Sequence, residues 1–323
     1  MADAANTVDE QASPALELPF ITLDVFTTSR FKGNPLAVVT IPHTLPAPPT
    51  QAQKQAIARE FNLSETVFIH DVDPTSSDTD TSQRKIDIFL TNAEIPFAGH
   101  PTIGAAVSLL PLGVRTVVAK AGPITITQTG PRAVEAGIPH DVRVHAKRLN
   151  ELSDEVTSTL NLSADPITRQ AELNGSLVSI VKGMTFLLIE LPSLDHLSRV
   201  QLNPPPLRLK EFLDEGWRDT FLGRYYFVRT GGDANSDVVK LRTRLIEPTL
   251  EDPATGSAAS ALCSYLSLTS EKADGETKFE VTQGVEMGRE SNILLTVELK
   301  EKKVDKVKLS GTATQVMRGF VSL

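Results

Sequence analysis

Cysteine is nearly absent from this chain of 323 residues, since Cys263 is the only one. A single cysteine excludes an intramolecular disulfide and a cysteine-based metal cluster. Aromatic residues make up 5% of the chain, and there is no run of about 18 apolar residues, so we expect no membrane-spanning segment. Cys263 lies in an apolar stretch, and we expect it to be a small buried side chain.

An excess of positive charge is also lacking. The formal net charge is −8, whereas binding to a nucleic acid backbone requires a basic surface. The densest basic run, KEKKVDKVK at 300–308, is interrupted by acids and valines, which is typical of a solvated turn between two strands. The sequence therefore predicts no nucleic acid partner.

The first residues, MADAANTVDEQASPALELP, lack the basic start and the apolar stretch of a secretory signal. Together with the single cysteine, this pattern predicts a cytoplasmic protein. We expect residues 1–18 to form a flexible tail.

One unusual pattern, E-x-P-x-x-G-[HS], occurs twice, as EIPFAGH at 94–100 and as EDPATGS at 251–257. The offset is 251 − 94 = 157, close to half of the 323 residues. A second pair, GNPLAVV at 33–39 and GMTFLLI at 183–189, has an offset of 183 − 33 = 150. The repeat and the length predict two related halves, residues 19–145 and 146–323. As a separate expectation, the last strand returns to the first half.

Apolar alternation and helical spacing predict the elements of each half. Strands are expected in the first half at 19–27, 36–41, 64–72 and 85–91, and in the second at 176–181, 183–191, 223–231 and 238–246. Helices are expected within 48–62, with Thr50 as the N-cap, and at 257–268. Both copies of the repeated pattern thus lie where a strand leads into a helix, in an α+β protein.

A glycine at the start of a helix lets a ligand approach the backbone, and the first helical amides have no partners within the helix. These amides attract anions, so we expect Gly99, Gly256 and Ser257 to bind a small carboxylate from both sides. Pro101 is expected at the first helical position, where its missing N–H has no cost. The alternative is a pair of ordinary connections with capped helices.

Six segments occur in order over residues 20–320: FKGNPLAVV, NLSETVFI, PFAGHPTIGAA, EDPATGSAAS, QGVEMGRESNI and GTATQVMRG. Together they resemble the phenazine-biosynthesis PhzF-like family, whose fold is shared with diaminopimelate epimerase. The resemblance implies two pseudo-symmetric domains, each a mixed β-sheet curled around a central helix, with the active site in the cleft between them. It also implies an enzyme that needs neither cofactor nor metal, moves protons on small carboxylate-bearing molecules, and often forms a homodimer.

The resemblance assigns the acid/base role to the glutamate of the S-E-T segment, which is Glu65 here. Glu65 is flanked by apolar Leu63, Val67 and Phe68, so partial burial is expected to raise its pKa towards neutrality. Such a carboxyl both takes and returns a proton. The alternative is a glutamate that caps a helix or forms a salt bridge.

His100 and Asp252 also match family positions that line the cleft. At a helix N-terminus the imidazole of His100 is expected to stay neutral and donate a hydrogen bond, while Asp252 orients a substrate group or tunes the proton on Glu65. Asn34 in the GNP triplet is expected either to reach the cleft as a substrate-binding residue or to serve only in the turn. Surface, capping and turn positions are the ordinary alternatives for these residue types.

Three functions follow from these assignments. The leading one is a cofactor-independent isomerase that shifts a double bond or a stereocentre on a small carboxylic acid. The alternatives are a lyase or other proton-transfer enzyme of secondary metabolism, and a non-catalytic protein that binds a small carboxylate. Two segments near the site depart from the family pattern, Asn92 in FLTNAE and the short LIEPTLEDP, so the substrate and the direction of reaction are left open.

Overall fold

The computed structural model describes residues 16–77, 80–231, 238–271 and 274–323. The strands up to residue 144 are β1 (Glu17–Val25), β2 (Asn34–Ile41), β3 (Thr66–His70), β4 (Gln83–Phe89), β5 (Glu94–Ile95), β6 (Thr116–Ala119), β7 (Gly122–Gly130), β8 (Ala133–Gly137) and β9 (Arg143–Val144). The later strands are β10 (Ser176–Val181), β11 (Met184–Glu190), β12 (Phe221–Arg229), β13 (Val238–Ile246), β14 (Glu251–Asp252), β15 (Gly275–Gln283), β16 (Ser291–Lys300) and β17 (Lys303–Ser322).

Within the described ranges, the helices are fewer than the strands. They are α1 (Gln51–Phe61), α2 (Gly99–Leu109), α3 (Asp154–Thr157), α4 (Pro166–Asn174), α5 (Leu194–Ser198) and α6 (Gly256–Leu268), with single 3-10 turns η1 (Leu110–Leu112), η2 (Leu149–Glu151) and η3 (Lys210–Phe212). Within the described ranges, every helix is too short or too polar to span a lipid bilayer.

The strands form a mixed sheet in which one pairing order occurs twice. From β1 to β8 the neighbours β1–β2, β2–β3, β3–β4, β4–β6, β6–β7 and β7–β8 pair antiparallel, parallel, antiparallel, parallel, antiparallel and antiparallel. The neighbours β10–β11, β11–β12, β12–β13, β13–β15, β15–β16 and β16–β17 pair in the same sequence of directions. The second half of the chain thus repeats the strand order of the first.

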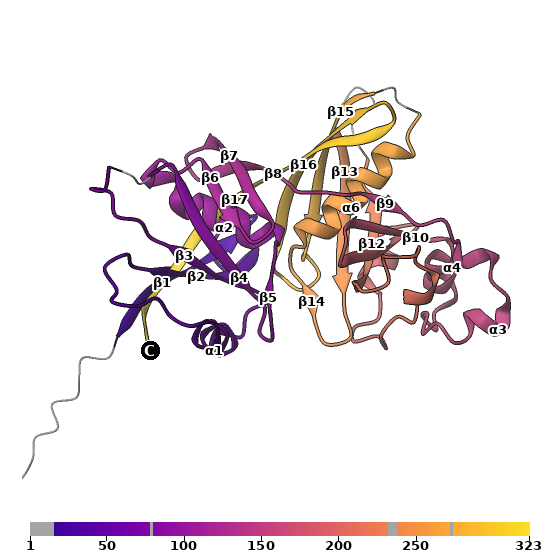
Figure 1. Cartoon of the computed structure of the whole chain (residues 1–323). Coiled ribbons are helices and arrows are strands. Elements are labelled where there is room, and N and C mark those ends of the chain that lie inside the picture. The colour runs from indigo at the N-terminus through magenta and orange to yellow at the C-terminus, as the bar shows by residue number, and fades with distance from the viewer. Residues whose placement is uncertain (1–15, 78–79, 232–237, 272–273) are drawn as a thin grey trace, which may run out of the picture.

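Strand β17 joins the two series. Its first part pairs with β16 and with β8, and its last part, from Ala313 to Ser322, pairs with β1. Because β17 contacts both β8 and β1, the first series closes on itself like a barrel. Figure 1 shows this yellow strand running from the orange elements to the indigo and magenta ones.

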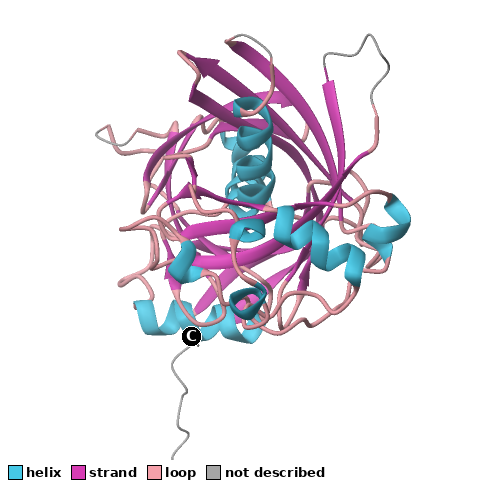
Figure 2. Cartoon of the chain, turned by 90° about the vertical axis from the view of Figure 1, so that its right-hand side faces the viewer, coloured by secondary structure: helices cyan, strands magenta, loops and turns pink. Residues whose placement is uncertain are grey.

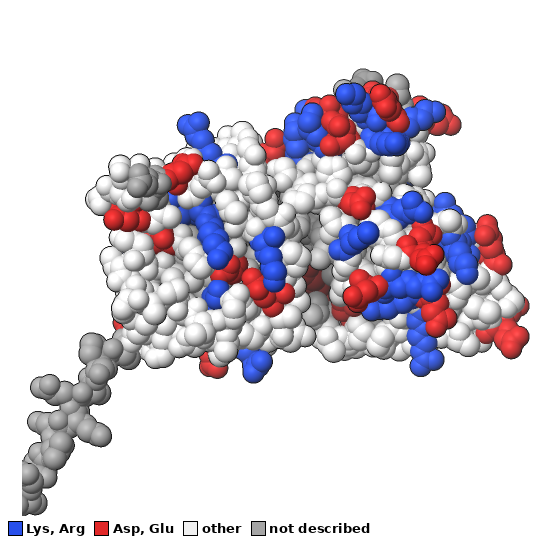
Figure 3. Space-filling view, in the orientation of Figure 1, with Lys and Arg blue, Asp and Glu red and all other residues white. Residues whose placement is uncertain are grey.

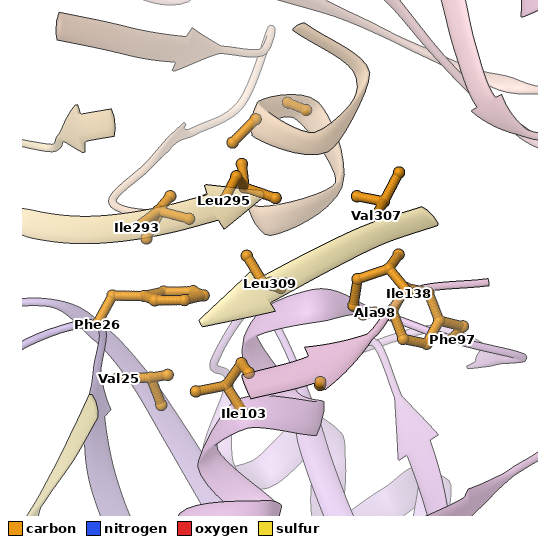
Figure 4. Close-up of a cluster of buried hydrophobic side chains, with 14 of the residues drawn as sticks. Val25, Phe26, Phe97, Ala98, Ile103, Ile138, Ile293, Leu295, Val307 and Leu309 are labelled. Carbon is orange, nitrogen blue, oxygen red and sulfur yellow. The ribbon is translucent and has the colours of Figure 1, made fainter. Parts of the chain in front are cut away.

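Each series curls around one helix. Helix α2 packs against β1, β2, β8 and β17, and α6 packs against β10, β11, β16 and β17. Figure 2 shows helices enclosed by curved strands. Both helices have small side chains and are buried almost from end to end, which lets the strands pack closely around them. One continuous apolar core includes both helices, and Figure 4 shows Leu309 of β17 within it, close to Ile103 of α2 and Leu295 of β16.

Most of the expected elements are confirmed. The strands and helices predicted in both halves are present, and Thr50 caps α1 in a capping box with Gln53. The turn expected in the basic run 300–308 is present but short: Glu301 and Lys302 take left-handed φ values of 52° and 58°, as a two-residue hairpin turn requires, and residues 303–308 already belong to β17. Cys263 is fully buried, as expected.

Two expectations need correction. Helix α2 starts at Gly99, so Pro101 is its third residue and not its first. The third helical N–H also lacks a partner within the helix, so proline fits there equally well. The tail expected over residues 1–18 ends earlier, because β1 begins at Glu17 and buries Leu18 opposite Val321; residues 1–15 lie outside the described ranges.

Candidate active site

The N-termini of α2 and α6 lie face to face. A Cβ atom placed on Gly99 would be 3.2 Å from the Cα of Gly256 and 2.9 Å from a methyl carbon of Leu309. The N-cap residues Ala98 and Thr255 make no side-chain capping hydrogen bond within the described residues. The repeated pattern therefore brings two uncapped helix ends into contact. Positions 99 and 256 are glycine because a side chain at either one would crowd the opposite helix end.

The side chain of Thr255 is engaged outside its helix. Its hydroxyl donates to Oδ2 of Asp252 at 2.5 Å and accepts from Nε2 of Gln283 at 3.0 Å. The same amide nitrogen of Gln283 donates to the backbone oxygen of Asp252 at 2.8 Å. These bonds fix the Asp252 carboxyl beside the start of α6.

Asn34, the first residue of β2, reaches across to the second copy of the pattern. Its Nδ2 donates to Oδ1 of Asp252 at 2.8 Å and to the backbone oxygen of Ala254 at 2.9 Å, and the residue is 1% exposed. Asn34 begins β2 directly after Gly33, which has a φ of 67°, and its role as a substrate-binding residue stays a prediction. Asn34 thus joins the start of β2 to the EDPATGS segment.

Glu65 and His100 form the other side of the cluster. Glu65 immediately precedes β3, and His100 is the second residue of α2. Oε2 of Glu65 lies 3.3 Å from Nδ1 of His100, with exposed fractions of 16% and 3% for the two side chains. The slightly exposed Glu65 carboxyl is thus the more accessible of the two groups.

Burial shifts the pKa of all three ionisable groups. It raises the pKa of Glu65 to about 7 and lowers that of His100 to about 4, against the opposing charge of Asp252. The pKa of Asp252 is raised to about 6, first by burial and then by the charge of Glu65. Near neutral pH the imidazole is therefore uncharged, and the proton on Glu65 is easily gained or lost.

The three expected carboxylate-binding residues line a second feature. Gly99, Gly256 and Ser257 border a small, mostly apolar pocket. Its other lining residues are Phe97, Ile138, Pro139, Ile180, Val181, Ser260 and Leu309. The groups Glu65, His100 and Asp252 are not part of this lining. The pocket and the ionisable cluster are adjacent along the chain. Gly99 of the pocket precedes His100 of the cluster, and Gly256 of the pocket follows Thr255, whose hydroxyl binds Asp252.

Some residues of the site were not anticipated. Thr255 and Gln283 both donate hydrogen bonds to Asp252. Both residues lie in segments that carry the family resemblance, but neither was singled out from the sequence. Glu247 is a third carboxyl: burial raises its pKa to about 7, and the charge of Asp252 contributes to the rise. Its Oε1 is buried and makes no hydrogen bond to any described residue. Its place in the short LIEPTLEDP segment was the only signal in the sequence.

The polar groups of the cluster do not form an evident metal centre. Among the residues that the structure describes, no three His, Cys, Asp or Glu side chains are placed to hold a metal ion. The arrangement is suited to exchanging protons between carboxyl groups, an imidazole and a bound molecule.

Comparisons with known proteins cover nearly the whole chain. A family model described as phenazine biosynthesis-like protein matches residues 23–319. An uncharacterized isomerase of Mesorhizobium japonicum is 31% identical over 93% of this chain and 97% of its own length. The trans-2,3-dihydro-3-hydroxyanthranilate isomerase of Pseudomonas fluorescens is 29% identical over 94% and 99%. The crystal structure of a Bacillus anthracis phenazine biosynthesis protein of the PhzF family has a TM-score of 0.71 at 20% identity, covering 95% of this chain and 100% of that one, which shows a shared fold.

Proposed function

The chain belongs to the phenazine biosynthesis-like protein family, and from this membership we propose that it is a cofactor-independent isomerase that moves a proton on a small carboxylate-bearing molecule. Two full-length relatives carry the name isomerase. The observation that carries the proposal is the meeting of Glu65, His100 and Asp252, from three separate elements, at two facing helix N-termini.

We take residues 19–145 and 146–323 as two domains that share β17, with the site in a cleft between them. The repeated pairing order supports this division, and so does the contact between the ends of α2 and α6. Figure 3 shows the surface hollowed between the left and right sides of the molecule.

The substrate carboxylate would bind at the helix ends. The first amides of α2 and α6 carry partial positive charge, and no side chain of a described residue caps either helix. The backbone near Gly99, Gly256 and Ser257 supplies these amides. On the face seen in Figure 3, lysine and arginine side chains are interspersed with acidic ones, so the helix ends and not a basic patch would attract the anion.

Glu65 would carry the proton. Its carboxylate removes a proton from one carbon of the substrate, and the resulting carboxylic acid returns a proton to another carbon. A pKa of about 7 suits both steps, because the free energy of protonation is then close to zero at neutral pH. The charge balance is kept, since the proton taken from carbon is restored to carbon.

His100 and Asp252 would support this transfer. The neutral imidazole is placed to hydrogen-bond a substrate oxygen or the Glu65 carboxyl, 3.3 Å away. Asp252, held by Asn34 and Thr255, orients a polar group of the substrate and keeps a negative charge near Glu65. A negative neighbour opposes ionisation of Glu65, so it keeps that carboxyl protonated for the second step.

Solvent exchange tests the proposal directly. The protein is incubated in heavy water with a panel of small unsaturated, hydroxylated and amino carboxylic acids, and carbon-bound protons are followed by NMR. We expect exchange or rearrangement of one compound by the wild type, and a loss of about 10²–10⁴-fold in the Glu65→Gln variant, the usual contribution of a general acid/base.

The matched control is Glu60→Gln, the same change at an exposed position of α1. It should retain full exchange. Release of water or an amine from the compound would indicate a lyase on the same site. Binding of a compound without exchange at any carbon, in wild type and variant alike, would contradict the isomerase and favour a non-catalytic carboxylate-binding protein.

A further inference from the structure

A turn between β15 and β16 contacts the loop that leads into β2. Arg289, in this turn of residues 284–290, donates from Nε to the backbone oxygen of Gly33 at 2.8 Å and from Nη2 to that of Lys32 at 3.0 Å. The same Nη2 forms an ion pair with Oδ1 of Asp24, 2.5 Å away. One guanidinium thus links a turn of the second half of the chain to a loop of the first.

Gly33 is held on both sides by this turn. Its carbonyl accepts from Arg289, and its N–H donates to the backbone oxygen of Glu290 at 3.0 Å. The φ of 67° leaves no alternative residue, because a Cβ here would lie 2.3 Å from the backbone oxygen of Val25. The peptide units on both sides of Gly33 are therefore fixed, and Asn34 follows immediately.

The turn itself is firmly attached to the second half. Gly284 packs on the EDPATGS segment, since a Cβ placed on it would lie 2.6 Å from the backbone oxygen of Pro253. Glu286 forms an ion pair with Arg242 of β13 at 2.9 Å. Gln283, just before the turn, donates to the backbone oxygen of Asp252 and to the hydroxyl of Thr255.

We propose that Arg289 is a positioning residue of the active site, which sets the place of Asn34 through Gly33 and thereby the hydrogen bond from Asn34 to Asp252. This inference deepens the proposed function and rests on it. Residues 283–290 then reach Asp252 from two sides, directly through Gln283 and indirectly through Arg289, Gly33 and Asn34.

The choice of arginine follows from the geometry. The guanidinium fork donates to two carbonyls and to a carboxylate at once, which a lysine ammonium, as a point charge on a flexible stem, does not reproduce. Arg289→Lys therefore keeps the charge beside buried Asp24 but releases at least one of the two carbonyls. Arg289→Gln serves as a second variant, because its single amide reaches still fewer of the three acceptors.

The readout is the titration of Asp252, followed by carboxyl-carbon NMR in the full-length protein without substrate. The bond from Asn34 lowers the pKa of Asp252, so its loss raises that pKa. We expect a rise of about one pH unit in Arg289→Lys, Arg289→Gln and Asn34→Ala alike. The double variant Arg289→Lys with Asn34→Ala should show no further rise, because both changes break the same chain of contacts. The ionisable groups near Asp252, namely Glu65, His100 and Glu247, are unchanged in all of these variants.

Lys32→Met is the matched control. Lys32 is exposed, and its Nζ also bridges the loop to the turn, at the backbone oxygen of Gly288, but it does not hold Gly33. It should leave the titration of Asp252 unchanged. An unchanged Asp252 titration in both Arg289 variants, or additive rises in the double variant, would overturn the inference. Because the readout needs no turnover, failure of the isomerase proposal would show separately, in the heavy-water experiment.

Discussion

At the scale of single residues, the site keeps ionisable groups in an environment that opposes their charge. Glu65 and Asp252 are two carboxyls whose pKa values are raised to about 7 and about 6, and burial keeps the nearby His100 imidazole neutral. Such an arrangement costs folding free energy whenever both carboxyls are ionised. The cost is typical of a site selected for chemistry and not for stability.

Glu65→Gln should stabilise the protein, and more so at higher pH. The folded pKa of Glu65 is raised above its ordinary 4.5 to about 7, so the folded state binds this proton more tightly than the unfolded state, and stability falls as pH rises between these values. The variant lacks this loss. We expect a gain on the order of 2 kcal/mol at about pH 8 and little gain at about pH 4, measured by urea unfolding.

The exposed Glu60→Gln change is the reference for this experiment. It should shift the free energy of unfolding by less than about 0.5 kcal/mol at both pH values. An equal gain for Glu65→Gln at both ends of the pH range would show that burial of the Glu65 charge is not its source.

The same variant should lower the pKa of Asp252. The negative charge of Glu65 is one of the two causes that raise it, and glutamine removes that charge while keeping the side-chain size. Carboxyl-carbon NMR titration of Asp252 in wild type and in Glu65→Gln measures the change. A pKa of Asp252 that does not fall would mean that the two carboxyls titrate independently.

At the scale of elements, the two central helices explain the repeated glycines. The ends of α2 and α6 approach each other so closely that a side chain on either glycine would meet Leu309 and the opposite backbone. The partial positive charges of the two helix N-termini therefore lie close together. The contact between these two elements is a requirement of the proposed anion site.

Gly99→Ala should therefore weaken binding of a small carboxylate and lower stability together. The added methyl lies 2.9 Å from a methyl carbon of Leu309, and such overpacking costs about 2 kcal/mol. Calorimetric titration with the compound found by solvent exchange measures the affinity, which we expect to fall more than about tenfold. Gly137→Ala is the control, because open space surrounds that position; an equal loss there would contradict the argument.

The individual elements were largely predictable, and their partners were not. Alternating apolar residues such as those of PFITLDV identify β1, and Thr50 marks the start of α1, because these signals are local. The strands between residues 116 and 144 were not predicted. The last strand was expected to return to the first half, but nothing local reveals that it pairs with β1, a pairing in which Val25 and Ala313 are partners at a separation of 313 − 25 = 288 positions. Long-range pairing depends on tertiary packing that no short window contains.

The sequence predicted which residues belong to the candidate site, but not the hydrogen bonds that connect them. Glu65, His100 and Asp252 lie near one another, and the repeated pattern gave both helix ends, but the catalytic roles of the three residues stay predictions. The bond from Asn34 to Asp252, 218 positions apart, could be seen only in three dimensions. Glu247 was missed because a single glutamate before a proline reads as a turn residue. The homodimer and the cytoplasmic location stay predictions.

At the scale of the whole molecule, β17 gives the two halves a shared core. Leu309, fully buried, contacts the first glycines of both α2 and α6, and Figure 4 shows it among apolar residues from both halves. A side chain in this position couples the packing of one half to that of the other. We therefore expect the halves to unfold together.

Leu309→Ala should lower the free energy of unfolding by about 3 kcal/mol, because it leaves a cavity between the two helix ends. Urea unfolding followed by tryptophan fluorescence and by circular dichroism should give coincident transitions at a lower midpoint. Leu294→Ala, at a residue of β16 that is 45% exposed, is the control and should have little effect. Two separated transitions in the wild type would contradict the shared core.

The pairing of β1 with Ala313–Ser322 also constrains how the protein is made. During synthesis, the strand that closes the first barrel-like series leaves the ribosome after the strands β10 to β16 of the second half. Until then, β1 has one free edge and the core around α2 lacks Leu309, so the nascent first half stays open to aggregation or to chaperones. The first half therefore lacks its closing strand until the strands of the second half have been translated, so we expect the two halves to complete their folding together and not one after the other.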